Sequence, residues 1–425
     1  MRVSTTINEN ELPDRFRQVF EIAPKEAWRR RAQNLADRER QNPFLTDYLD
    51  ERYTIERSLA WALAHRDQFG RFPPVRGPHG GRYFELYSFI HILGNVYPRL
   101  SPKGQSSVRG YMKNGLDTDT GLTPFAHELA VAAHLWTADF DVEFTDAEGR
   151  TRFDILARKE GLELEVDCKA TSGDIGRQIH RRRVLELFHR VRPALDQLLQ
   201  KGGGRTMDIV LPGALHGSEP YMNAVTGAVS DAVIQGKFLS VADVADVSLG
   251  AFALHEEPAL LAGRPDLVGL VERRLGRANP HAIWIGGPEA AVVVAVSSRK
   301  PDKVVDRIYR TLKESAEGQF GGMNPALVAI RLLDLTMEQL HELASDASGK
   351  LGTVCHRLFA GARRGHLFGV AFVSPADALT ESVGASEVEF SDRGMALLFR
   401  RGGHPLAQDP RLILFHPRAP LARTI

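Results

Sequence analysis

The chain of 425 residues contains few features that would place it outside a reducing compartment. It has two cysteines, Cys168 and Cys355, and two cysteines do not make a disulfide framework. No apolar run is long enough to cross a membrane, and the N-terminal stretch MRVSTTINENELPDRF lacks the apolar core of a secretory signal. We therefore expect a cytoplasmic protein with no membrane partner.

Several common catalytic motifs are also missing. From residue 213 onward there is no glycine-rich phosphate loop, no zinc-ligand spacing and no Ser-His-Asp arrangement. The net charge of +1 indicates no partner when it is averaged over the chain. Between Arg177 and Arg205, however, eight residues are basic and two are acidic. A local excess of positive charge is typical of a protein that binds a polyanion.

The length and composition predict two or three folded domains, since 43% of the residues are apolar and 25% are charged. Residues 1–118 are predicted to form a mainly helical domain, with helices at Pro24–Arg40 and Asp47–Phe69. Residues 119–215 and 216–425 are predicted to form two α/β domains. The C-terminal domain is predicted to contain a helix at Pro301–Phe320 and strands at Ala245–Leu254, Ala290–Val296, Ala326–Leu333, Phe368–Val373 and Leu412–Phe415.

The most informative stretch is residues 152–170, RFDILARKEGLELEVDCKA. From Leu162 onward, apolar and charged residues alternate with the period of a half-buried strand. Lys159-Glu160-Gly161 predicts a hairpin turn that joins this strand to an earlier one. Asp154 would then lie on the first strand, with Asp167 and Lys169 on the second. Two carboxylates crowded on one sheet face require a cation between them, and a divalent metal ion is the natural candidate.

The flanking segments add a further carboxylate and a group of basic residues. Thr123 and Pro124 predict the start of a helix, with Thr123 as its N-cap. Glu128 lies on the apolar face of that helix and needs either a buried partner or a role as a ligand. Residues 177–200 predict a helix with arginines directed outward, and Thr206–Leu211 predicts a buried strand in the same sheet.

The sequence is also consistent with other interpretations of these residues. Asp167 and Lys169 are also compatible with an ordinary ion pair on a solvated sheet, and the arginine run with a solvated helix face. Glu165 points to the same face as Asp167 and could compete as a ligand, although a surface position is the simpler expectation. Cys168 is expected to be a small buried apolar residue.

These residues resemble the PD-(D/E)xK nuclease superfamily, the fold of many restriction endonucleases and repair nucleases. The resemblance covers about residues 123–212 and depends on Asp154, on Asp167-Cys168-Lys169 and on Glu128 in the preceding helix. The proline that gives the family its name is absent, since Phe153 precedes Asp154. The resemblance implies a restriction endonuclease-like mixed-sheet core within an α/β protein, between a helical N-terminal domain and a C-terminal α/β domain.

The resemblance also implies a set of roles. Asp154, Asp167 and the Cys168 carbonyl would bind Mg²⁺ or Mn²⁺, Glu128 would bind it through water or recruit a second ion, and Lys169 would polarise the attacking water. Phosphates would be held by residues after the second strand, namely Arg177, Gln178, Arg181, Arg182 and Arg183. The expected function is metal-dependent hydrolysis of nucleic acid, DNA by preference, in restriction, anti-phage defence or repair.

The alternative function is that of a non-catalytic subunit that binds nucleic acid or assembles with a partner through a degenerate nuclease fold. A homodimer, or a partner protein bound through the N- or C-terminal domain, would be consistent with either function.

Overall fold

The computed structural model describes residues 3–4, 6–74, 80–172, 174–261, 267–276, 280–333, 340, 343, 350–373, 387–389, 396–412 and 423–424. The chain forms two compact units. Unit 1 comprises Met1–Asp37, Leu49–Gly173 and Val305–Ile425, and unit 2 comprises Arg38–Tyr48 and Asp174–Val304. The chain therefore does not divide into the three consecutive domains that the sequence predicts, because residues 174–304 interrupt unit 1.

The N-terminal region is helical, as predicted. Its helices are α1 (Leu12–Ile22), α2 (Lys25–Gln41), α3 (Thr46–Arg52), α4 (Thr54–Phe69), α5 (Gly80–Val96), α6 (Pro102–Asp117) and α7 (Thr123–Thr137). The helix predicted at Asp47–Phe69 is two helices that separate at Tyr53. The helix α7 begins at Thr123, but Leu122 is its N-cap, and the Thr123 hydroxyl instead donates to the Arg52 carbonyl (3.1 Å).

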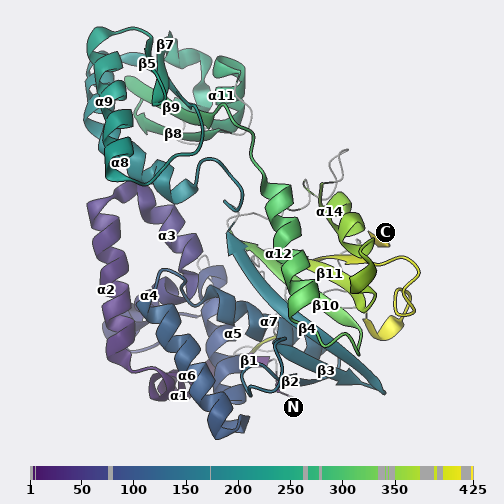
Figure 1. Cartoon of the computed structure of the whole chain (residues 1–425). Coiled ribbons are helices and arrows are strands. Elements are labelled where there is room, and N and C mark those ends of the chain that lie inside the picture. Colours follow the sequence, from purple (N-terminus) through teal and green to yellow (C-terminus); the bar gives the residue numbers. More distant parts are fainter. Residues whose placement is uncertain are drawn as a thin grey trace. The chain divides into compact units, whose positions relative to one another are not determined.

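Unit 1 contains a seven-stranded mixed sheet (Figure 1), in which the strands follow the order β14-β13-β11-β10-β4-β3-β2. Their bounds are β2 Asp141–Phe144, β3 Ile155–Lys159, β4 Leu162–Ser172, β10 Ala326–Leu333, β11 Leu367–Val373, β13 Ala396–Arg400 and β14 Arg423–Thr424. The central strands β4, β10 and β11 are parallel, whereas β2, β3 and β4 are antiparallel. A separate short pair joins β1 (Thr6–Asn8) to β12 (Glu387–Glu389).

The strand that follows β4 in this sheet is β10, with Cys168 paired to Ala329. The sequence predicts Thr206–Leu211 for that position, and this prediction is wrong, because that strand belongs to the sheet of unit 2. Both segments are mainly apolar, each with one charged residue, Asp208 or Arg331, and such segments fit any strand that is buried on both faces. The connection to β10 passes through unit 2 and α12 (Val304–Gly318), and α14 (Lys350–Phe359) lies between β10 and β11.

Both faces of β4 are covered. Leu164, Val166 and Cys168 belong to the apolar core that also contains the buried residues of α7. On the other face, Asp167 contacts Ser315 of α12. The prediction of a half-buried strand with a solvated face is therefore wrong over this part of β4, because the helix that connects parallel strands packs on the sheet.

Unit 2 contains a five-stranded mixed sheet with the order β6-β7-β5-β9-β8. The strands are β5 Gly203–Leu211, β6 Leu239–Val241, β7 Ala245–Phe252, β8 His281–Gly286 and β9 Ala290–Ser298. The helices are α8 (Arg181–Gln200), α9 (Glu219–Gln235), α10 (Pro258–Leu261) and α11 (Leu267–Leu275). Apolar residues of α8 and α9 share one core with Met207, Ile209 and Leu211 of β5. The two central strands, β5 and β9, are parallel, so their carboxyl ends lie at one edge of the sheet.

The fold is thus mixed α/β with two mixed sheets, as the sequence predicts at that level. The strand predicted at Leu412–Phe415 falls, apart from Leu412, outside the described residues, and Leu412 itself lies in a 3-10 turn. No helix among the described residues has both the length and the apolar character needed to span a membrane.

Candidate functional site

The candidate site lies where the β3–β4 hairpin ends. The hairpin is confirmed: Ile155 pairs with Val166, and Glu160 and Gly161 form the turn with positive φ angles of 48° and 77°. The backbone ladder between the strands stops at Ile155. One residue earlier, the Asp154 carboxylate accepts the Cys168 N–H through Oδ2 (2.5 Å). A side chain thus replaces the missing backbone acceptor, and this bond fixes Asp154 against the Asp-Cys-Lys segment.

Asp167 is fully buried and is held on both carboxylate oxygens. Its Oδ1 accepts a hydrogen bond from Lys169 Nζ (2.8 Å), and its Oδ2 accepts one from the Ser315 hydroxyl of α12. Burial lowers the pKa of Lys169, but the charge and hydrogen bond of Asp167 raise it by more than burial lowers it, so the net pKa is above its ordinary value. Lys169 is therefore a fixed cation at neutral pH.

Burial and neighbouring carboxylates make the ionised forms of Asp154 and Glu128 unfavourable. Burial, and then the charge of Asp167, raise the pKa of Asp154 to about 7. Burial, followed by the charges of Asp154 and Asp146, raises the pKa of Glu128 well above its ordinary value. The Glu128 carboxylate has no hydrogen-bond partner within the described part of the chain. The structure thus brings Glu128, Asp154, Asp167 and Lys169 into electrostatic contact, as the sequence predicts for a site.

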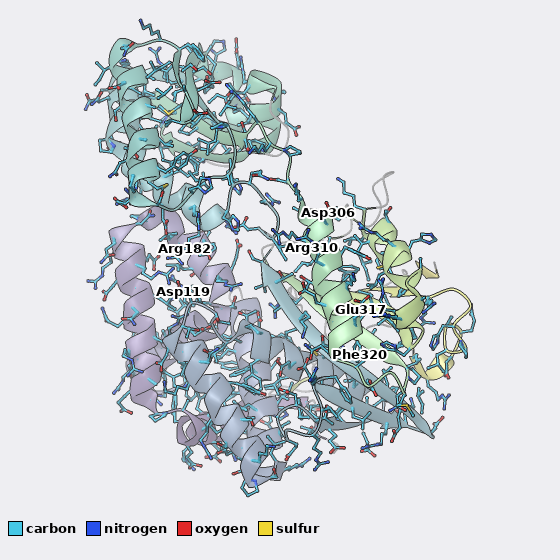
Figure 2. All side chains as sticks on the ribbon, viewed as in Figure 1. Asp119, Arg182, Asp306, Arg310, Glu317 and Phe320 are labelled. Atoms are coloured by element: carbon cyan, nitrogen blue, oxygen red, sulfur yellow. The ribbon has the colours of Figure 1, made fainter. Side chains whose placement is uncertain are left out.

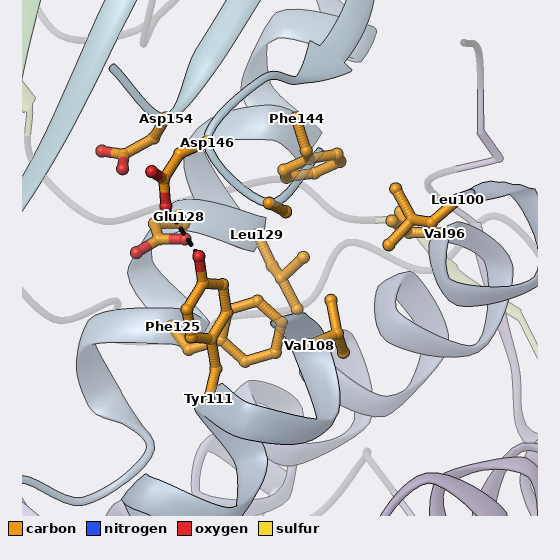
Figure 3. A pocket seen from close by; sticks show the side chains of 11 residues that line it. Val96, Leu100, Val108, Tyr111, Phe125, Glu128, Leu129, Phe144, Asp146 and Asp154 are labelled. Carbon is orange, nitrogen blue, oxygen red and sulfur yellow. Dashed lines mark hydrogen bonds between the residues drawn. The ribbon is translucent and has the colours of Figure 1, made fainter. Parts of the chain in front are cut away.

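A small cavity beside these residues contains a carboxylate that the sequence does not single out. Figure 3 shows Glu128, Asp146 and Asp154 around one end of this cavity, and Tyr111 of α6 pointing toward them. The Tyr111 hydroxyl donates to Asp146 Oδ2 (2.6 Å). Burial and this hydrogen bond raise the pKa of Tyr111. Asp146 lies in the turn between β2 and β3, and nothing in the local sequence distinguishes it from an ordinary turn aspartate.

The loop after α12 closes the other side of the strand. Gly321 donates its N–H to the Glu165 carboxylate (2.9 Å), and Glu165 is 3% exposed. The expectation that Glu165 is a surface residue is therefore wrong, since the loop covers it and a backbone donor satisfies it. Phe320, labelled in Figure 2, stacks on Phe153 with ring centroids 6.4 Å apart. Cys168 is buried as predicted, and burial raises the pKa of its thiol.

Asp154 and Asp167 are the two carboxylates at this site that could bind a metal ion. Among the described residues, no group of three or more His, Cys, Asp or Glu side chains is placed to hold one ion. Mg²⁺ in phosphoryl-transfer sites, however, is bound by one or two carboxylates and keeps several waters. Asp154 and Asp167 match that requirement. Burial is the main cause of the raised pKa of Asp154, and repulsion by Asp167 adds to it; a bound cation would remove that repulsion.

The five predicted phosphate-binding residues are not part of the unit that contains this site. Arg177, Gln178, Arg181, Arg182 and Arg183 all lie in unit 2, in or just before α8. The prediction that α8 follows the lysine strand in the same sheet domain is wrong, and α12 occupies that position in unit 1. The local sequence could not reveal this, because both helices are amphipathic and both precede an apolar strand.

Comparisons with models of protein families, with curated proteins and with solved structures found no match.

Proposed function

We propose that unit 1 is a Mg²⁺- or Mn²⁺-dependent phosphodiesterase that hydrolyses nucleic acid, with DNA as the preferred substrate. The observation that carries this proposal is the convergence of Asp154, Asp167 and Lys169 at the end of one hairpin, with Glu128 contributing from α7. This combination of acids and a cation suits phosphodiester cleavage, which requires an activated water and neutralisation of charge on the phosphoryl oxygens.

The proposed core is of the PD-(D/E)xK type, with a long insertion. Under this proposal the core consists of α7, β3, β4, α12 and β10, and unit 2 is inserted between the lysine strand and the next core helix. The same resemblance suggests a role in restriction, anti-phage defence or repair. Support comes from the α7–hairpin arrangement and from the contact that α12 makes with Asp167.

Each residue has a distinct task in the proposed reaction. Asp154, Asp167 and the Cys168 carbonyl would hold the ion, which when bound would neutralise phosphoryl charge and acidify a water. Lys169 stays protonated because Asp167 holds it, so it would orient the water or a phosphoryl oxygen by its charge and would not remove a proton. Glu128 would bind the ion through water or recruit a second ion, because burial and the charges of Asp154 and Asp146 raise its pKa and a nearby cation would stabilise its ionised form.

A second function is favoured by one specific observation. Both oxygens of Asp167 already accept hydrogen bonds, one from Lys169 and one from Ser315, which is also the arrangement of a structural ion pair. A non-catalytic subunit that binds nucleic acid would retain this geometry without cutting its ligand.

The two functions are separated by cleavage and binding assays on the same variants. Supercoiled plasmid, single-stranded DNA and RNA are incubated with the protein in Mg²⁺, Mn²⁺ or EDTA. We expect cutting in a metal and none in EDTA, with Asp167→Ala and Lys169→Ala abolishing cutting but leaving binding nearly unchanged. Glu163→Gln is the matched control, because Glu163 lies exposed on the same strand and its ion pair with Arg158 lies on the surface. Survival of every substrate in both metals would favour the non-catalytic subunit.

A further inference from the structure

We propose that unit 2 carries a binding surface for a phosphodiester chain at the carboxyl ends of β5 and β9. The surface, here called the basic edge, consists of residues 174–183, 212–217 and 298–303. It deepens the proposed function, on which it rests for the choice of a nucleic acid as the polyanion. It adds Lys300 and Lys303, which the sequence does not mark as phosphate-binding residues.

The basic edge is a single structure built from three segments distant in sequence. Leu211 and Ser298, the last residues of β5 and β9, are paired in the parallel ladder, so the segments after them start side by side. Three hydrogen bonds join the segments: Lys303 N–H to Gly176 O (2.7 Å), Leu215 N–H to Gln178 O (3.0 Å) and Ser298 O–H to Gly213 O (3.0 Å). Ligands of open α/β sheets commonly bind outside the carboxyl ends of the parallel strands, and the basic edge occupies that position.

Positive charge dominates this surface. Its segments contain two acidic residues, Asp174 and Asp302, and seven basic residues, namely Arg177, Arg181, Arg182, Arg183, Arg299, Lys300 and Lys303. Both acids are engaged by backbone groups: Asp174 accepts the Arg181 N–H (2.6 Å), and Asp302 accepts the Gln178 N–H (2.7 Å). The acids thus shape the loops, while the basic side chains set the sign of the surface.

Some of these cations are neutralised within unit 2 and others are available. Arg299 pairs with Asp246, and Arg182 pairs with Glu186. Lys300 and Lys303, by contrast, are exposed and form no ion pair with any described residue. We therefore expect Lys300 and Lys303 to contact phosphates directly.

Two further observations place positive charge around the same loops. The Nε of Arg177 is buried and has no hydrogen-bond partner among the described residues. Two other cations lie close to segment 212–217. A Cβ on Gly213 would lie 3.6 Å from Lys300 Nζ, and one on Gly217 would lie 3.3 Å from Arg183 Nη1. Several cations close to one loop suit the repeated negative charges of a phosphodiester backbone.

The test measures binding without cleavage, in EDTA, by fluorescence anisotropy with the full chain. The ligands are a labelled DNA duplex, the matching single strand and an RNA of the same length, each over a range of salt concentrations. The variant is Lys300→Gln/Lys303→Gln. Loss of two phosphate contacts should reduce the salt slope of log K by about 2 and weaken binding roughly 50-fold at about 0.1 M salt.

Lys237→Gln is the matched control. Lys237 is an exposed lysine of unit 2 that follows α9, and the 17 residues of that helix place it roughly 25 Å along the helix from segment 212–217. The control should keep the wild-type slope. Thermal unfolding of both variants checks that unit 2 is intact, and Lys300→Arg/Lys303→Arg should restore binding.

Each outcome decides the inference. A reduced slope in the double variant but not in the control supports it, and the ligand bound most tightly identifies the source of the phosphodiester chain. An unchanged slope in the double variant, or no binding of any nucleic acid by the wild type, overturns it. Binding through the basic edge without any metal-dependent cleavage would leave this inference standing and end the proposed nuclease activity. Metal-dependent cleavage together with unchanged binding by the double variant would support the proposed nuclease activity and overturn the basic edge as its binding surface.

Discussion

Because the charge of Asp154 is buried, we expect its removal to increase the stability of the folded protein at high pH. Burial and the charge of Asp167 raise the pKa of Asp154 from 3.8 to about 7. Between these two values the folded protein keeps a proton that the unfolded chain releases, so the free energy of unfolding falls as the pH rises from about 4 to 7. A shift of about three units corresponds to roughly 4 kcal/mol once the pH exceeds 7.

Asp154→Asn should therefore stabilise the metal-free protein at pH 8. The amide removes the charge but keeps an oxygen that can accept the Cys168 N–H. The expected gain is up to about 4 kcal/mol, or up to roughly 8 °C in Tm at about 2 °C per kcal/mol for a domain of this size. At pH 5 the gain should fall to less than half, because the wild-type carboxyl is then protonated in the folded state.

Thermal unfolding in EDTA at pH 5 and pH 8 measures this effect. Glu163→Gln is the control, because its exposed carboxylate should change Tm little at either pH. An Asp154→Asn variant that is no more stable than the wild type at pH 8, or that changes Tm equally at both pH values, would refute the reasoning about this site.

Three other predictions follow from the same contacts. Mg²⁺ should raise the Tm of the wild type more at pH 8 than at pH 6, because the ion binds the ionised carboxylates. Asp154→Asn should lose this effect. An equal rise in the wild-type Tm at both pH values would count against carboxylate ligation. Ser315→Ala should cost about 1–3 kcal/mol in denaturant unfolding, because it leaves an oxygen of buried Asp167 without its donor, and no change would mean that the contact is not made. Tyr111→Phe should lower the free energy of unfolding by about 1 kcal/mol, because it removes the hydrogen bond to Asp146. Tyr111→Leu should lower it by more. An unchanged Tm in Tyr111→Phe would show that the bond contributes nothing.

The local part of the candidate site could be predicted from the sequence. Alternation after Leu162 and the Glu160-Gly161 turn determine the hairpin, since both depend on residues close in the chain. The hairpin register then places Asp154 beside Asp167, because residues opposite each other across an antiparallel pair share a face.

The long-range part could not be predicted, because local patterns do not specify which strands pair. The apolar runs at 206–211 and 326–333 are equivalent by periodicity, yet it is the second that pairs with β4. The inserted unit therefore could not be recognised from the sequence. The contact of Ser315 with Asp167 depends on that topology and is not predicted for the same reason. Asp146 lies in the β2–β3 turn, where nothing in the local sequence distinguishes it from an ordinary turn aspartate.

The measurement that tests the central claim most directly is the single-turnover rate of cleavage by wild-type protein and Lys169→Met, with the preferred nucleic acid in saturating Mg²⁺. The account predicts a loss of about 10²–10³-fold in rate with little change in affinity, because the fixed ammonium stabilises charge on the reacting groups. Equal rates for the two proteins, or no cleavage by the wild type in either Mg²⁺ or Mn²⁺, would contradict it.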